Sequence, residues 1–175
     1  RKTVIPKIKK ILYATDLSDN AVYVLRYAVD SAKKHDAKII ILHVLEPMPV
    51  TAEAMALSYI SEEQLRKTQE DEEINAIDRI QKRLKIICEK EFKNDPECTE
   101  RVESIEVCEG FPPDSILRIA DERDCDAIIM GTHTRGAIAN TFLGSTAKRV
   151  LRRTRKPVFI IPLPKGEVDI TFHGI

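Results

Sequence analysis

The sequence predicts an α/β protein: one domain built on a twisted, mostly parallel sheet of five strands, with helices on both faces. Apolar runs of strand length alternate with segments of helical periodicity, an order typical of parallel strands joined by right-handed crossovers. The run Ile39–Leu42 is apolar at every position, as in a strand covered on both faces. At 175 residues the chain has the length of a single domain.

The first two strands and the helix between them are expected within residues 8–45. Ile8–Ala14 is an apolar run that ends at Thr15 and Asp16, and Ser18 is expected to cap the helix that follows. The second strand is expected over Ala37–Leu45, at the centre of the sheet. The helix is predicted by apolar residues at helical spacing, namely Ala21, Val24, Leu25, Ala28 and Ala32.

An insertion and a long charged helix separate the second strand from the third. Pro47 and Pro49 end the strand pattern, and residues 47–60 are only weakly periodic, which predicts a mobile or interface-forming insertion. Ser61 and Gln64 match a capping box that opens a helix over residues 61–92. The many charges of this helix are expected to form a solvated face.

Residues 102–163 complete the predicted domain, which begins at residue 1, and residues 164–175 are expected to form a tail. The chain turns at Gly110 into a helix that is expected to be capped near Asp114. The remaining predicted elements are strands at Val102–Val107, Ala127–Met130 and Val158–Ile161, and a helix at Ser145–Arg153.

The charge balance argues against polyanionic partners. Lys+Arg and Asp+Glu both count 28, so no global field attracts nucleic acid or an anionic membrane. The sequence has no apolar stretch near the ~20 residues that span a bilayer, and a cytoplasmic protein is expected. One basic cluster lacks interleaved aromatic residues and is expected to be solvated surface: Lys148, Arg149, Arg152, Arg153, Arg155 and Lys156.

The four cysteines do not have the spacing of a zinc site. Cys108 and Cys125 fall in or beside strand patterns, where a buried thiol acts as a small hydrophobe. Cys88 and Cys98 flank a turn, so a disulfide between them is feasible. Two reduced thiols are the expected state, because the cytosol is reducing.

A glycine-punctuated loop follows the apolar run that ends at Met130. Gly131 and Gly144 lack a Cβ, so backbone N–H groups there can approach an anion closely. Ser145 and Thr146 are expected at a helix N-terminus, where free N–H donors and the helix dipole attract negative charge. The sequence lacks both G-x-x-x-x-G-K-[ST] and a G-x-G-x-x-G after a strand, so the kinase and NAD fingerprints are absent.

The order Gly131, Thr134, Gly144 and Ser145 resembles the G-x2-G-x9-G-[ST] nucleotide loop of the universal stress protein family, with threonine in place of the second glycine. Three more segments resemble that family in the same order along the chain. With the loop they make a specific match from Lys9 to Pro162. They are Lys10–Ser18, Ile41–Val44 and Gly110–Pro112.

The resemblance implies a Rossmann-like fold of the adenine nucleotide alpha hydrolase type, with a nucleotide site at the carboxyl end of the sheet. In nucleotide-binding members, the aspartate ending strand one and the apolar residue opening strand two contact adenosine, while the glycine loop takes ribose and phosphates. The implied ligand is ATP, ADP or AMP, with Mg²⁺ as an accompanying ion. The matching residues are Ala14, Thr15, Asp16, Ile39, Met130, Gly131, His133, Thr134, Arg135, Gly144, Ser145 and Thr146.

Thr134 is where the loop departs from the family pattern. A β-branched residue adopts positive φ poorly and adds a side chain where glycine lets phosphate approach. Against that, Gly136 can relieve the turn and the Thr134 hydroxyl can donate to an oxygen.

The first expectation is a stress-response regulatory protein that binds an adenine nucleotide and forms a homodimer through its last strand, Val158, Phe159, Ile160 and Ile161. One alternative is a dimeric interaction module that binds no nucleotide, which Thr134 favours. Another is a slow ATP hydrolase, for which Asp16 is the acid expected near the site and no water-positioning partner is visible. No catalytic residue is assigned.

Overall fold

The computed structural model describes residues 5–93, 95–132 and 143–162. It confirms the predicted α/β architecture with a five-stranded parallel sheet. The predicted tail, residues 164–175, lies outside the described residues. The elements are β1 (Lys10–Thr15), α1 (Ala21–His35), β2 (Lys38–Leu45), α2 (Val50–Leu57), α3 (Glu62–Glu91), β3 (Val102–Glu109), α4 (Pro112–Glu122), β4 (Ala127–Gly131), α5 (Ser145–Arg153) and β5 (Val158–Ile161).

The sheet has the strand order β3-β2-β1-β4-β5. The chain starts in the middle with β1, adds β2 and β3 on one side, and then crosses over to add β4 and β5 on the other. The order therefore switches between β1 and β4, where Ala14 pairs with Met130. In open parallel sheets the crevice at such a switch point is the usual ligand site.

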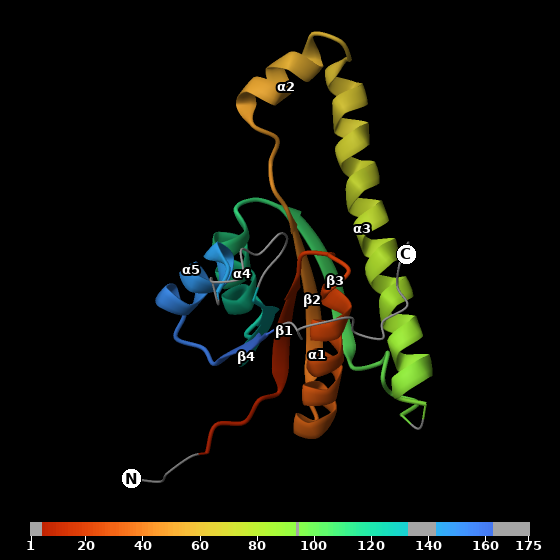
Figure 1. Ribbon diagram of the computed structural model, residues 1–175, viewed down its shortest axis with the longest axis vertical. Coiled ribbons are helices and arrows are strands. Elements are labelled where there is room, and N and C mark those ends of the chain that lie inside the picture. The colour runs from red at the N-terminus through yellow and green to blue at the C-terminus, as the bar shows by residue number, and fades with distance from the viewer. Residues whose placement is uncertain (1–4, 94, 133–142, 163–175) are drawn as a thin grey trace.

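Two apolar layers hold the sheet between its helices. Figure 1 shows α4 and α5 on one side of the sheet and α1 and α3 on the other. Successive strand residues point to opposite faces: Ile11 and Ile39 belong to the core beneath α1 and α3, whereas Leu12 and Ile40 belong to the core beneath α4 and α5. All four are fully buried, and burying each such side chain contributes about 1.5–3 kcal/mol.

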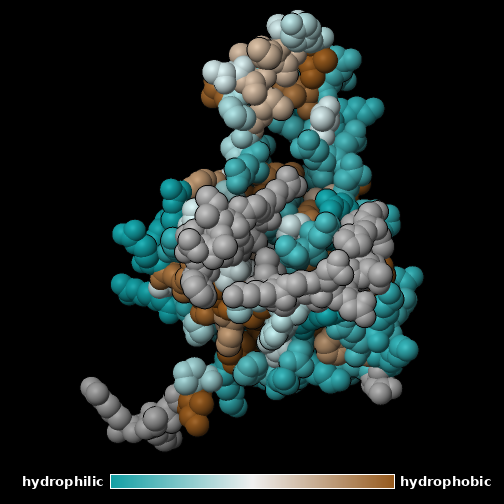
Figure 2. Space-filling model, in the orientation of Figure 1, coloured by the Kyte–Doolittle hydropathy of each residue, from teal (hydrophilic) through white to brown (hydrophobic). Residues whose placement is uncertain are grey.

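An arm formed by residues 47–75 projects from this body, as α2 and the first half of α3 in Figure 1. The predicted capping box is confirmed, since Ser61 Oγ accepts from the Gln64 N–H and Gln64 Oε1 accepts from the Ser61 N–H. The side chains of α3 that reach the main core begin at Ala76. Figure 2 shows apolar surface gathered at the end of the arm, where Met48, Val50, Met55, Leu57 and Tyr59 are exposed.

Several element boundaries differ from the sequence-based expectation. The N-cap position of helix α1 is Asn20 rather than Ser18, and the Asn20 side chain makes no capping hydrogen bond; Ser18 instead forms a side-chain turn with Asp16. Helix α4 begins at Pro112 after Phe111, so Asp114 lies inside its first turn instead of capping it. The insertion at residues 47–60 contains helix α2, which its weak periodicity did not predict.

Cys88 and Cys98 form a disulfide, so the expectation of reduced thiols is wrong. That expectation rested on the cellular compartment, whereas the pairing is set by the turn that follows α3. The Asp95 N–H donates to the Phe92 carbonyl, and the Cys98 N–H donates to the Asp95 carbonyl. This turn brings the two cysteine Cα atoms to 5.7 Å, within the range that a disulfide bridges.

Within residues 5–93, 95–132 and 143–162, no helix combines the length and the apolar character that crossing a membrane requires.

Candidate functional site

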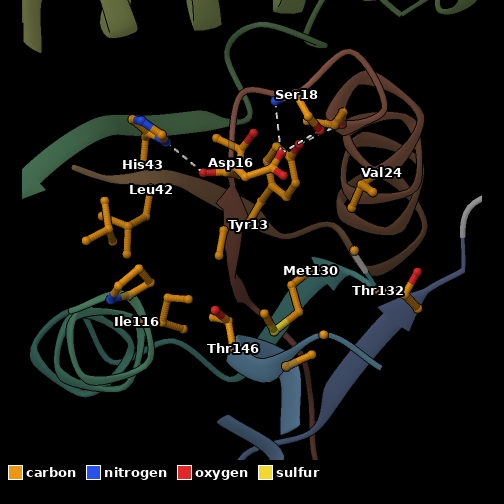
Figure 3. A pocket seen from close by; sticks show the side chains of 18 of the residues that line it. Tyr13, Asp16, Ser18, Val24, Leu42, His43, Ile116, Met130, Thr132 and Thr146 are labelled. Carbon is orange, nitrogen blue, oxygen red and sulfur yellow. Dashed lines mark hydrogen bonds between the residues drawn. The ribbon is translucent and has the colours of Figure 1, made fainter. Parts of the chain in front are cut away.

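A cavity of about 450 Å³ opens at the carboxyl ends of β1, β2 and β4, where the strand order switches. Figure 3 shows its walls: the loop after β1, the end of β2, helix α4, the end of β4 and the start of α5. Its volume lies within the range of sites for small molecules and cofactors, roughly 300–1,000 Å³.

The loop after β1 supplies a carboxylate whose orientation is fixed by its neighbours. Asp16 Oδ1 accepts from the Ser18 N–H at 3.0 Å and from the Ser18 hydroxyl at 2.7 Å. Thr15 Oγ1 accepts from the Leu17 N–H at 3.1 Å, and Leu17 adopts a left-handed backbone with φ of 58°. This tight turn holds the half-buried Asp16 at the cavity wall.

Tyr13 lies behind this loop with its side chain fully buried. Burial raises the pKa of Tyr13 above its ordinary value; the Thr15 hydrogen bond opposes the shift, Asp16 adds to it and Arg83 opposes it. The phenol therefore stays protonated, and its O–H donates to the Ala21 carbonyl at 2.7 Å. This bond ties the end of β1 to the first turn of α1.

The start of α5 forms an electropositive corner of the cavity. Gly144 is the N-cap residue and provides no side-chain cap, and the first turn contains no acidic residue. Ser145 and Thr146 line the cavity with Gly144, and the Gly144 N–H donates to the Thr132 carbonyl. Backbone N–H groups at an uncapped helix start bind anions, because the helix dipole adds to their hydrogen bonds.

Apolar side chains line the part of the cavity between β2, α4 and β4. Leu42, Ile116 and Met130 border it in Figure 3 and also belong to the core beneath α4 and α5. Their support by that core keeps this wall in place. His43 adds a polar group, since its Nδ1 lies 2.9 Å from the Thr15 carbonyl oxygen.

The structure brings most of the sequence-predicted site residues to this cavity. Three fall outside the described residues: His133, Thr134 and Arg135. Ile39 does not reach the cavity, because it sits near the start of β2, fully buried beside Ile11 at the opposite end of the sheet. The predicted residues that line the cavity are Ala14, Thr15, Asp16, Met130, Gly131, Gly144, Ser145 and Thr146.

The sequence-based assignment missed the carboxyl end of β2, where Leu42, His43 and Val44 line the cavity. The signal was available, because ligands in parallel sheets sit at the carboxyl ends of strands. Ala14 and Leu42 are partners in the sheet, so the end of β2 lies level with the end of β1. Val24 and Ile116 were also missed, since an apolar residue on a helix reads as ordinary core.

Two arginines of α3 contact the loop after β1 from outside the cavity. Arg79 Nη2 donates to the Leu17 carbonyl at 3.2 Å, and Arg83 Nη1 donates to the Ser18 carbonyl at 2.9 Å. Burial lowers the pKa of Arg83, as does the neighbouring Arg79, while Tyr13, Asp19 and Asp16 oppose the shift. Arg83 remains a cation at neutral pH, because an arginine titrates so far above it.

The described residues contain no group of three or more His, Cys, Asp or Glu side chains that could hold a metal ion. Asp16 and Glu46 are the acidic side chains among the described residues that line the cavity.

Comparison with known proteins places this fold in a family. The model of the Universal stress protein family matches residues 7–162. Universal stress protein MJ0531 of Methanocaldococcus jannaschii is 28% identical over 159 residues, which are 91% of this chain and 85% of that protein. Universal stress protein MJ0577 of the same organism is 28% identical over 153 residues, which are 87% of this chain and 94% of that protein.

Solved structures agree with this match. The structure of protein MJ0577 aligns with a TM-score of 0.67 at 25% identity, covering 92% of this chain and 100% of that one. A universal stress protein in complex with cAMP and one from Archaeoglobus fulgidus in complex with dAMP each have a TM-score of 0.51 at 22% identity. They cover 90% and 87% of this chain, and 98% and 96% of their own. The chain belongs to the universal stress protein family.

Proposed function

We propose that this protein is a stress-response regulatory protein that binds an adenine nucleotide in the cavity at the carboxyl end of the sheet. The observation that carries the proposal is the combination of three chemistries in one cavity: the apolar wall at Leu42 and Ile116, the carboxylate of Asp16 and the uncapped start of α5. In this proposal a purine packs on the apolar wall, N–H and O–H groups of the nucleoside donate to Asp16, and phosphates bind at the start of α5.

The family relationship supports the same ligand class. Two universal stress proteins of this fold are complexes with cAMP and with dAMP, both of which contain adenine and a phosphate. In this proposal a nucleotide with more phosphates is bound by the N–H groups of Ser145 and Thr146 at the start of α5, and Mg²⁺ accompanies its phosphates.

The test is isothermal titration of the nucleotide-stripped protein with ATP, ADP and AMP, each with and without Mg²⁺. Asp16→Asn should weaken binding at least about tenfold, because it removes the charge of a hydrogen-bonding carboxylate. The matched control is Asp30→Asn on α1, a carboxylate that does not line the cavity and pairs with Lys34 instead, which should bind like the wild type. Absence of binding by the wild type to all three nucleotides would reject the proposal and favour the interaction module.

The variant Gly131→Val is a second test of nucleotide binding in the cavity. A Cβ at residue 131 would lie 3.1 Å from Val24 Cγ2, so the further methyl groups of valine must displace Val24 or enter the cavity. Loss of nucleotide binding is expected, while far-UV circular dichroism stays that of a folded α/β protein. Unchanged affinity would mean that the nucleotide does not approach Gly131.

We also propose that the protein is a homodimer through β5. Among the residues that the structure describes, this strand forms one edge of the sheet and pairs with β4 alone, and Phe159 on it is 39% exposed. A second copy that pairs with the free edge would satisfy its backbone groups and cover its apolar side chains.

A further inference from the structure

A chain of hydrogen bonds leads from α3 to the carboxylate of Asp16. Arg83 binds the carbonyl of Ser18 at 2.9 Å, and the N–H and hydroxyl of the same Ser18 bind Asp16 Oδ1. Arg79, one turn earlier on α3, binds the carbonyl of Leu17 at 3.2 Å. These contacts link segments 62 and 65 residues apart in the sequence.

Helix α3 contributes this contact from deep inside the protein. Arg83 is 2% exposed, although its neighbour on the helix, Lys82, has 59% of its side chain exposed. Burying a guanidinium beside a second arginine is unfavourable unless hydrogen bonds and opposite charge compensate for the lost water. Here the Ser18 carbonyl accepts its hydrogen bond, and an Asp19 carboxylate oxygen lies 3.9 Å from Arg83 Nη2.

The loop needs support from outside, because its conformation is locally unfavourable. Leu17 has a φ of 58°, a left-handed backbone that residues other than glycine rarely adopt. The two arginines hold the carbonyl oxygens of Leu17 and Ser18 on the side of the loop that faces α3. The opposite side of the loop carries Asp16 to the cavity wall, as Figure 3 shows.

We propose that Arg83, supported by Arg79, is a positioning residue that holds Asp16 in its ligand-binding orientation, so that occupancy of the cavity is coupled to helix α3. The inference rests on the proposed nucleotide function and adds to it the means by which the site is regulated. Neither arginine lines the cavity, so both act through the loop rather than on the ligand.

The coupling works in both directions, as thermodynamic linkage requires. A ligand that engages Asp16 stabilises the loop conformation that the arginines bind, and therefore stabilises the docked position of α3. A partner that displaces the arm would pull on the same arginines and weaken ligand binding. The arm consists of α2 and the exposed first half of α3. In this proposal it is the part of the protein through which a change in the cavity reaches a partner.

The first experiment is a double-mutant cycle on nucleotide affinity, measured by titration calorimetry with AMP and ATP. Arg83→Met should weaken binding about tenfold, the effect of losing one charge-assisted hydrogen bond. Lys82→Met, a matched change at the preceding position of the helix, should stay within about twofold of the wild type. In an Asp16→Asn background, Arg83→Met should change the affinity by less than about threefold, because its effect passes through that carboxylate.

The outcomes separate the two ideas. If the wild type binds none of the nucleotides, the proposed function fails, and this inference fails with it. If the wild type binds and Arg83→Met binds equally well, the positioning role alone is overturned. Equal losses with and without the Asp16 carboxylate would also overturn it, since they would show that Arg83 supports the fold without acting through Asp16.

A second measurement uses only the wild type, in case Arg83→Met does not fold. Hydrogen exchange followed by mass spectrometry should show slower exchange on nucleotide addition in residues 16–20 and also in residues 79–87 of α3. Protection limited to the cavity-lining segments, with α3 unchanged, would refute the coupling even though the nucleotide is bound.

Discussion

Reduction of the Cys88–Cys98 disulfide is expected to lower the free energy of unfolding by about 2.8 kcal/mol. The two cysteines are separated by 10 positions, so the bridge closes a loop of about eleven residues. The loop-closure entropy of such a ring, −2.1 − 1.5R ln n cal/mol/K, corresponds to about 2.8 kcal/mol at 25 °C. For a chain of this size the melting temperature should fall by about 6 to 11 °C.

The folded state should survive this reduction, because other contacts hold the same turn. Ile87 is fully buried in the core, and Asp95 Oδ2 lies 3.5 Å from Lys33 Nζ. The reduced protein should therefore still unfold in a single cooperative transition, with a lower midpoint. Its helix and sheet content should be unchanged before that transition begins.

The assay is equilibrium urea unfolding of the oxidised and the fully reduced protein, with the redox state of each sample established by intact mass. A Cys88→Ala/Cys98→Ala variant is the control, and its midpoint should not respond to the reductant. Equal midpoints for oxidised and reduced wild type would refute the entropy argument, and four free thiols in the oxidised sample would refute the bridge itself.

Three further results are expected. Ser61→Ala removes the hydroxyl that caps α3 and should cost about 1 kcal/mol locally, seen as roughly fivefold faster hydrogen exchange over residues 62–66; unchanged exchange would mean that the cap does not hold the helix start. Burial raises the pKa of Cys125 from 9.0 to about 11, so the folded state favours the neutral thiol. Its contribution to stability is complete below about pH 9 and is lost as the pH rises towards 11, so at pH 10 the wild type should have lost roughly 1 kcal/mol more than Cys125→Ala in urea unfolding; parallel pH profiles would contradict this. Phe159→Lys should give a folded monomer in size-exclusion chromatography with light scattering, and a persistent dimer would exclude β5 as the interface.

Local signals in the sequence were sufficient for most of the architecture. The apolar runs that became β1, β2 and β4 are continuous because these strands are covered on both faces, and the capping box at Ser61 and Gln64 marks the start of α3 within one residue. The start of α1 was misplaced by two residues, since Ser18 is a competent cap that here serves Asp16 instead.

The candidate site was harder to predict where its residues depend on long-range packing. Ile39 and Leu42 belong to the same apolar run, and the direction of the strand, rather than the residue types in it, distinguishes the buried end from the cavity end. Arg83 sits in a charged helix that reads as solvated surface, yet it is buried against a loop 65 residues away. Neither distinction is present in local composition.

Helix α3 also has the geometry of a lever. The disulfide links its carboxyl-terminal end to the turn before β3. From nearer its middle, Arg79 and Arg83 bind the loop after β1, and its amino-terminal end projects from the body. At 1.5 Å per residue, Glu62 lies about 32 Å along the axis from Arg83, so a tilt of about 5° there would move the tip by roughly 3 Å. A small movement of α3 beside the loop at the cavity would therefore produce a larger movement of the apolar surface at the end of the arm.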